Sequence, residues 1–393
     1  QAHVFFEKGI QKMEMLHTQD GLDNFRNAVQ ADPQFALGHI FLTFFSQDPT
    51  EQVAEREKAL ATRASAGPEE KLIIDWLANA SKANWVPAIQ AMNEALSGYP
   101  NDKHLHWLAG WWLQLDRSQT QRAIAIFEQT MKIDPSFHES QLGLGDTYAL
   151  MGDQQKARAE YAKAIEVASP VQKVVWSLQV AATYVREGDL AAADKAFSAV
   201  AEQAHAKDFV TIEAEAYRSM SLYQLEGPAS LALLAKAEAA LKEVHKVPQS
   251  LLNQELAQVL RTRVERALAD NNAELAAATL KQLQTLSEAN DADGIITGAF
   301  HGAAGTMALT EGKFADAVNH LEEDDSNAIS MRALIAAYNK NGQQGNATRL
   351  AAKLAALNVP LIEQAVVVPE FRKQRAALAS KSNPALDPRA KYR

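Results

Sequence analysis

The chain has 393 residues, a formal net charge of −9 and no cysteine. The acidic balance argues against a general nucleic-acid-binding protein, which needs a basic face, and the lack of cysteine excludes disulfides, thiolate catalysis and cysteine-ligated metals. A composition rich in alanine and leucine favours helix over strand. No apolar run approaches the roughly 18 residues of a transmembrane helix, so we expect no membrane-spanning segment.

Residues 3–33 are the first segment in which small and aromatic residues recur at helical spacing. Gly21, Phe25 and Ala28 fall on one face of a predicted helix, because residues three and four apart are neighbours on a helix surface. The small residue lets the preceding helix approach closely, and the aromatic ring then fills the space between the two helices. Pro33 ends the unit, since proline cannot continue a helix interior.

Residues 35–67 are predicted to form a second, degenerate pair of helices. Phe41, Phe44 and Phe45 give the first helix an apolar face, but the second helix lacks the small-to-aromatic spacing. A third pair is expected from Pro68 onward, because proline in the first turn favours the start of a helix.

The clearest copies of the pattern lie in residues 101–170. Ala123 is followed four residues later by Phe127, and Ala157 is followed by Tyr161 at the same spacing. The two alanines are 34 residues apart, and a period of 34 residues built from two helices is the signature of a tetratricopeptide repeat. The chain therefore resembles the tetratricopeptide-repeat family, in its bacterial-type multi-repeat form.

The resemblance implies an all-α fold: a right-handed α-α superhelix, or solenoid, of about nine antiparallel helix pairs. After residue 170 the spacing drifts, as expected where each repeat contacts only its neighbours. The predicted organisation is residues 1–100, partly degenerate repeats; 101–206, the best-matching repeats; 207–360, divergent repeats; and 361–393, a capping helix followed by a basic tail.

Few residues are spaced as catalytic or metal-binding residues are. The glycines of residues 143–145 lie inside a predicted helix with no strand before them, which disfavours a dinucleotide-binding loop. His104 and His106 point to different faces of a helix, so surface or capping roles are favoured over zinc binding. Residues 322–325 are four consecutive acids without the spacing or glycine of a calcium loop, which favours a solvated turn. We therefore expect no enzyme, no cofactor and no metal ion.

The remaining candidate site is a surface. In solenoids of helix pairs, the first helices line a concave face that binds peptides. By resemblance to the family, the candidate peptide-binding groove consists of Leu108, Trp112, Asp116, Leu142, Asp146, Leu150, Arg186, Tyr217 and Gln224, with Leu178 and Ala182 on the same face. Family members that bind acidic chaperone tails carry Lys and Asn at such positions, and the Leu, Trp and Asp found here disfavour that carboxylate clamp. Trp112 is the tryptophan expected to face solvent or a ligand, whereas Trp107, Trp111 and Trp176 are expected to fill the core.

The predicted function is a non-catalytic scaffold or adaptor that binds a protein or peptide partner. Two other classes stay open, namely a self-assembling structural homo-oligomer and the regulatory or sensory part of a larger chain. Because the chain starts at Gln1 without a methionine, we expect that an N-terminal segment was removed. That favours an exported, periplasmic protein, with a cytoplasmic location as the alternative.

Overall fold

The computed structural model describes residues 1–14, 18–46, 48–224, 227–243 and 247–382, and these residues are helical throughout apart from turns. The first helices are α1 (Ala2–Glu14), α2 (Thr18–Ala31), α3 (Ala36–Phe45), α4 (Pro49–Thr62), α5 (Pro68–Ala80), α6 (Trp85–Gly98), α7 (Lys103–Gln114), α8 (Thr120–Ile133), α9 (Glu139–Met151) and α10 (Gln154–Val167). They are followed by α11 (Pro170–Glu187), α12 (Leu190–His205), α13 (Val210–Tyr223), α14 (Gly227–Lys242), α15 (Gln249–Ala269), α16 (Ala273–Glu288), α17 (Gly294–Thr310), α18 (Phe314–Glu322), α19 (Ala328–Lys340), α20 (Gln344–Ala356) and α21 (Ile362–Ser382).

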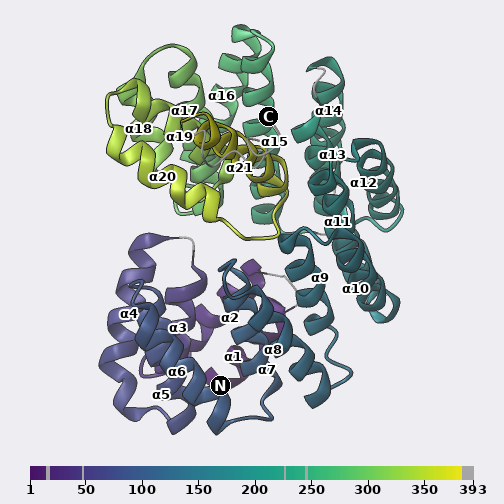
Figure 1. Cartoon of the computed structure of the whole chain (residues 1–393). Helices are drawn as coiled ribbons and strands as arrows, with labels where there is room; N and C mark the ends of the chain where they lie inside the picture. Colours follow the sequence, from purple (N-terminus) through teal and green to yellow (C-terminus); the bar gives the residue numbers. More distant parts are fainter. Residues whose placement is uncertain (15–17, 47, 225–226, 244–246, 383–393) are drawn as a thin grey trace, which may run out of the picture. The chain divides into compact units, whose positions relative to one another are not determined.

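Successive helices pack as antiparallel pairs, as the repeat pattern predicts (Figure 1). Helices α1 to α20 form ten such pairs in the described part of the chain, close to the expected number of about nine, and α21 follows them. Among the described helices, none has the length and apolar content that crossing a membrane requires.

The turns between paired helices explain why the helices begin and end where they do. Gly152 has φ +94° and Gly188 has φ +87°, a backbone conformation that glycine adopts without steric cost. The side chain of the next residue, Asp153 or Asp189, accepts a hydrogen bond from the backbone of the following helix, as N-caps do. A Gly–Asp dipeptide therefore ends one helix and starts the next.

The small-to-aromatic spacing produces the core contacts that the sequence predicts. Phe25, Phe127 and Tyr161 are all fully buried between the two helices of their pairs. A Cβ atom added to Gly110 would lie 2.7 Å from the ring of Phe127, so glycine is what allows α7 to approach α8 this closely. These contacts confirm that the small and aromatic residues which indicate the repeat in the sequence pack between the two helices of a pair.

The chain divides into two compact units. Unit 1 contains Gln1–Leu113 and Gln121–Leu144, and unit 2 contains Gln114–Thr120 and Gly145–Arg393. The division falls inside the segment 101–206 that was expected to carry the best-matching repeats, and it passes through α9. Each unit has its own buried apolar side chains.

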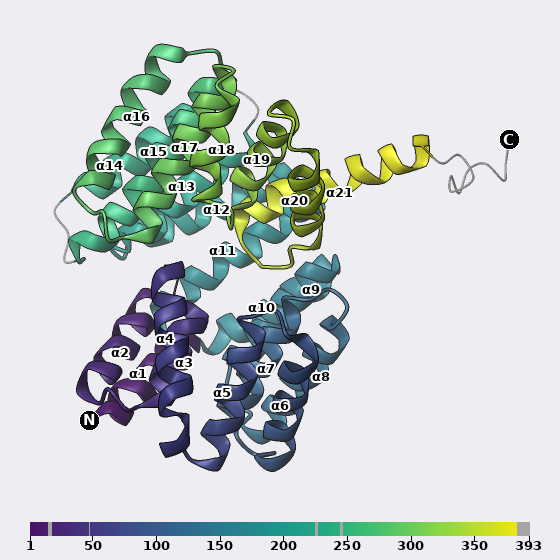
Figure 2. The same cartoon turned by 90° about the vertical axis from the view of Figure 1, so that its left-hand side faces the viewer.

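Within unit 2, the helix α21 packs against the first helices of earlier pairs as well as against the last pair, α19 and α20. It contacts α11, α13 and α19, and its last turns extend past α20 (Figure 2). Ile362 and Ala365 join the apolar cluster of α11 to α13, whereas Val367 and Val368 join that of α18 to α20. The helix α21 thus covers apolar residues of an inner face of unit 2.

The basic tail is described only in part. Arg372 donates hydrogen bonds of 2.9 and 2.7 Å to the carbonyl oxygens of Ala355 and Leu357, and so fixes α21 to the end of α20. The remainder of the predicted tail, from residue 383, lies outside the described residues.

Candidate functional site

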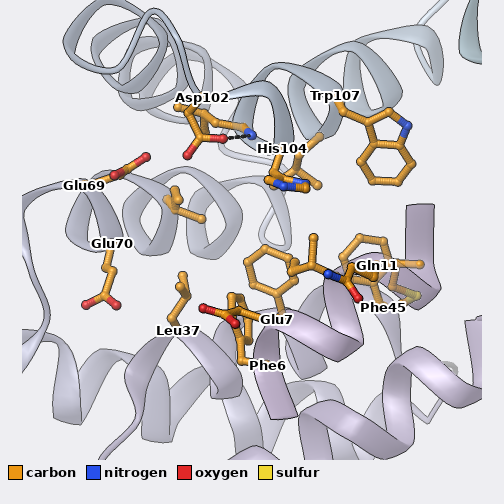
Figure 3. Close-up of a pocket in the computed structure, with 16 residues that line it drawn as sticks. Phe6, Glu7, Gln11, Leu37, Phe45, Glu69, Glu70, Asp102, His104 and Trp107 are labelled. Carbon is orange, nitrogen blue, oxygen red and sulfur yellow. Dashed lines mark hydrogen bonds between the residues drawn. The ribbon is translucent and has the colours of Figure 1, made fainter. Parts of the chain in front are cut away.

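A pocket of about 420 Å³ lies between the first helices of the four helix pairs at the start of unit 1 (Figure 3). We call it the inner pocket. It is lined by Phe6, Glu7, Ile10, Gln11 and Met13 of α1, Leu37, Phe41 and Phe45 of α3, Glu69, Glu70 and Ile73 of α5, and Asp102, His104, Leu105, Trp107 and Leu108 at the start of α7. Its volume is within the range of roughly 300–1,000 Å³ that is usual for ligand sites.

Aromatic rings build one wall of the inner pocket. Phe6 meets Phe41 edge to face, with ring centroids 4.9 Å apart, and Phe41 lies 5.8 Å from Phe45. Trp107 stacks on Trp111, whose ring is 5.4 Å from that of Phe45. Because each ring is held by another, this wall is preformed rather than assembled when a ligand arrives.

Carboxyl groups line the opposite side of the pocket, where Glu69, Glu70 and Asp102 lie across from Trp107 (Figure 3). Asp102 caps α7 by accepting a hydrogen bond of 2.9 Å from Leu105 N, and Glu70 accepts one of 2.8 Å from Gly67 N. Both caps place acidic side chains at the starts of α5 and α7, where the helix dipole favours negative charge.

Glu69 lies near enough to Asp102 for the two carboxyl groups to repel each other as like charges. Burial, together with the nearby carboxyls of Asp102 and Glu70, raises the pKa of Glu69 to about 7. A nearby like charge and burial both disfavour the ionised form of a carboxyl group. This side of the pocket is therefore electrostatically strained when both groups are ionised.

His104 closes one end of the inner pocket. Its Nδ1 atom lies 2.5 Å from Glu14 Oε1, which joins the start of α7 to the end of α1. Burial lowers the pKa of His104, but the hydrogen bond to Glu14 and its charge outweigh burial and raise this pKa above its usual value. His106 instead makes a hydrogen bond of 2.7 Å with the backbone oxygen of Asp102. The two histidines thus have separate structural roles, as expected from their spacing.

The helix pair of α9 and α10 provides the link to a known family. Residues 138–170 match the family model of the tetratricopeptide repeat. Residues 138–170 therefore form a tetratricopeptide repeat. The match does not concern the source of the chain, so the bacterial type stays a prediction. A comparison of the sequence with curated proteins found no match.

Several solved tetratricopeptide-repeat structures are similar to this chain. Yeast Tom70 has a TM-score of 0.46 and 13% identity, covering 99% of both chains. PilW, a type IV pilus biogenesis factor, has a TM-score of 0.32 and 14% identity, covering 72% of this chain and 92% of its own. The apo form of RapI has a TM-score of 0.41 and 12% identity, covering 81% of this chain and 98% of its own. At these identities the similarity concerns the helical fold and not a ligand or an activity.

In unit 1, the structure brings one predicted groove residue to the inner pocket. Leu108 lines it, whereas Leu142 is buried on α9. The expectation that Trp112 faces solvent is wrong, since its side chain is only 9% exposed. Its ring packs edge to face on Trp76, with centroids 5.4 Å apart, and Trp85 covers it at 6.3 Å. Trp107 is buried as predicted.

The predicted acidic spot in unit 2 is also buried. Asp146 accepts a hydrogen bond of 2.6 Å from the hydroxyl of Tyr161, and it is not exposed in the groove. Burial raises the pKa of Asp146 to about 7, although Tyr161 and the charge of Arg186 oppose the shift. Leu150 is buried too, and Asp116 is exposed in the turn after α7, where it caps Ser118 N.

The remaining groove residues of unit 2 contact other parts of the same unit. Arg186 donates two hydrogen bonds of 3.3 Å to the carbonyl oxygens of Val359 and Leu361, just before α21. Gln224 donates to the Asp194 carboxylate at 3.1 and 3.2 Å, and Tyr217 is half-buried below Lys236. Leu178 and Ala182 belong to the same apolar cluster as Ile362 and Ala365. The inner face of α11 and α13 is thus occupied by the segment that leads into α21.

Sequence reasoning missed most of the inner pocket. Acids in the first turn of a helix stabilise its start, a role that Glu70 fills. The sequence holds one indication of the inner pocket. Glu69 and Glu70 follow Pro68, and Asp102 precedes Leu105, so acids lie at the starts of two first helices. The prediction of a solvated turn is wrong for Asp324, whose side chain is only 10% exposed and pairs with Arg261 at 2.9 Å.

Proposed function

We propose that this tetratricopeptide-repeat chain is a non-catalytic binding protein, and that a segment of a protein or peptide partner enters the inner pocket of unit 1. The supporting observation is that the first helices of four consecutive pairs, α1, α3, α5 and α7, converge on one preformed cavity. First helices form the ligand-binding face in solenoids of this kind. In unit 2, by contrast, part of the corresponding face already packs against α21.

A peptide selection tests this proposal with a variant that blocks the pocket. Gln11 is exposed and lines the pocket, so Gln11→Trp places a large ring there with little expected loss of stability. Gln90→Trp is the matched control, because Gln90 is exposed on α6 and does not line the pocket. Random peptides displayed on phage are selected on the full chain, and the enriched peptides are measured with all three proteins by fluorescence anisotropy.

The enriched peptides are expected to bind the wild type and Gln90→Trp equally, and Gln11→Trp at least tenfold more weakly. The proposal fails if the selection enriches no peptide, or if the enriched peptides bind Gln11→Trp as tightly as they bind the control. Far-ultraviolet circular dichroism of both variants establishes that the helical content is unchanged.

A further inference from the structure

We infer that the inner pocket takes a cationic, apolar segment, in which a bulky aliphatic or aromatic side chain lies next to a lysine or arginine. This inference rests on the proposed function and adds the chemistry of the ligand to it. Three features of the described structure carry it: the apolar cavity, the charge of its lining and the lack of a cation to balance that charge.

The cavity itself fits an apolar side chain. Ten of its lining residues are apolar, and they come from all four helices: Phe6, Ile10, Met13, Leu37, Phe41, Phe45, Ile73, Leu105, Trp107 and Leu108. Burying apolar surface contributes roughly 25 cal/mol per Å². A volume of about 420 Å³ accommodates a large side chain together with some of the adjoining backbone.

The charge of the lining has one sign. Four carboxyl groups line the pocket, those of Glu7, Glu69, Glu70 and Asp102. No lysine or arginine is among the described residues that line it, and the single imidazole, that of His104, is already engaged by Glu14. A ligand carboxylate would therefore meet four acidic groups and no free cation.

No cation in the described lining of the inner pocket balances these carboxyl groups. Burial and the repulsion between Glu69 and Asp102 raise the pKa of Glu69 to about 7, so Glu69 keeps its proton up to about neutral pH. In the described part of the chain, Glu7 is exposed and makes no hydrogen bond or ion pair. An ammonium or guanidinium group placed between these acids would release the proton and replace repulsion by attraction. Charge complementarity thus selects a basic ligand.

The first test compares four synthetic peptides of about ten residues in binding to the full chain. They share one scaffold and differ at the centre: Phe between two lysines, Phe between two glutamines, Phe between two glutamates, and Ser between two lysines. We expect the peptide with Phe and lysines to bind at least tenfold tighter than the peptides with glutamates or with Ser. Its affinity is expected to fall several-fold between about 0.05 and 0.5 M salt, because salt screens exposed charges.

The second test removes the acids without changing their shape. The double variant Glu69→Gln/Asp102→Asn keeps a helix cap at position 102, since Asn caps as well as Asp does. It is expected to bind the lysine peptide about tenfold more weakly and the glutamine peptide with unchanged affinity. Glu57→Gln is the control, because Glu57 is exposed on α4 and does not line the pocket.

The possible outcomes separate this inference from the proposed function. If the glutamate peptide binds as tightly as the lysine peptide and Gln11→Trp blocks it, the pocket is a binding site but the inference on charge is overturned. The same holds if the double variant and Glu57→Gln bind the lysine peptide equally. If none of the four peptides binds in a way that Gln11→Trp abolishes, while selected peptides do, the inference fails alone. If selected peptides are also insensitive to Gln11→Trp, both fail.

Discussion

Arg218 Nη1 donates a hydrogen bond of 2.7 Å to Glu363 Oε1 and thereby joins α13 to α21 across 145 residues of sequence. Both side chains are buried in unit 2. Burial lowers the pKa of Arg218, but the carboxyls of Glu363, Glu255 and Glu215 outweigh it and raise this pKa above its usual value. Glu255 itself has a pKa raised to about 8 by burial and by neighbouring acids. The charge of Arg218 is therefore balanced mainly by Glu363.

Removing the acid of this pair is expected to be costly. Glu363→Ala leaves a buried guanidinium without its main partner, a change that typically costs about 3–5 kcal/mol in the free energy of unfolding. Denaturation in guanidinium chloride measures it. Glu370→Ala, at an exposed position of the same helix, should cost about 0.5 kcal/mol or less. An equal loss of unfolding free energy in the two variants would show that Glu215 and Glu255 balance the charge of Arg218 when Glu363 is removed.

Trp112→Ala is expected to destabilise unit 1 rather than to weaken ligand binding alone. The side chain is buried against Trp76 and Trp85, and replacing a buried tryptophan by alanine costs about 3–5 kcal/mol. Trp85 is 55% exposed, so Trp85→Ala should cost far less. A thermal unfolding series measures both. An unchanged melting temperature for Trp112→Ala would restore the original interpretation of Trp112 as an exposed anchor.

Gly110→Ala is expected to destabilise by about 1–3 kcal/mol, as overpacking of a core does, even though alanine is the better helix former. The cause is the ring of Phe127, whose Cε1 atom would lie 2.7 Å from the new methyl group. In a double-mutant cycle with Phe127→Leu, the two changes should be non-additive because they share one contact. If the two changes in the free energy of unfolding are additive, α7 and α8 do not pack through Gly110 and Phe127.

Asp146→Asn is expected to change how stability depends on pH. The pKa of Asp146 is about 7 in the folded chain and near 3.9 in an unfolded one. The folded state therefore holds a proton between these values that the unfolded state has lost, and stability falls as pH rises from about 4 to about 7. The asparagine variant lacks this loss, so its stability relative to the wild type should increase by roughly 2–4 kcal/mol between pH 4 and pH 8. Urea denaturation at a series of pH values measures it, and parallel curves would contradict it.

The sequence predicts the helix pairs because their determinants are local. Gly152 and Asp153 define a turn by themselves, and Ala157 and Tyr161 define a contact within one pair. The inner pocket depends instead on how closely four pairs curl around one another, which is set by packing between repeats. Glu69 and Asp102 carry no local signal that they meet. The same is true of Trp76 and Trp112, whose contact buries a side chain expected to be exposed.

The position of α21 could not be predicted from the repeat frame either. The repeat period in the sequence predicts contacts between consecutive helix pairs. The hydrogen bonds from Arg186 to Val359 and Leu361 instead connect segments that are far apart in the sequence. The apolar residues of α21 indicated a helix with a buried side. They did not indicate which face of the earlier repeats that side would cover.

The fold-back of α21 has a consequence for the synthesis of the protein. Arg186 and Val359 are 173 residues apart, an interval that takes roughly 10–35 s at typical rates of chain elongation. During this time α11 and α13 have left the ribosome, but the apolar residues that α21 will cover are still exposed. A nascent chain with such a face is prone to association with other chains. The yield of folded protein should therefore depend on how fast the final helix is translated.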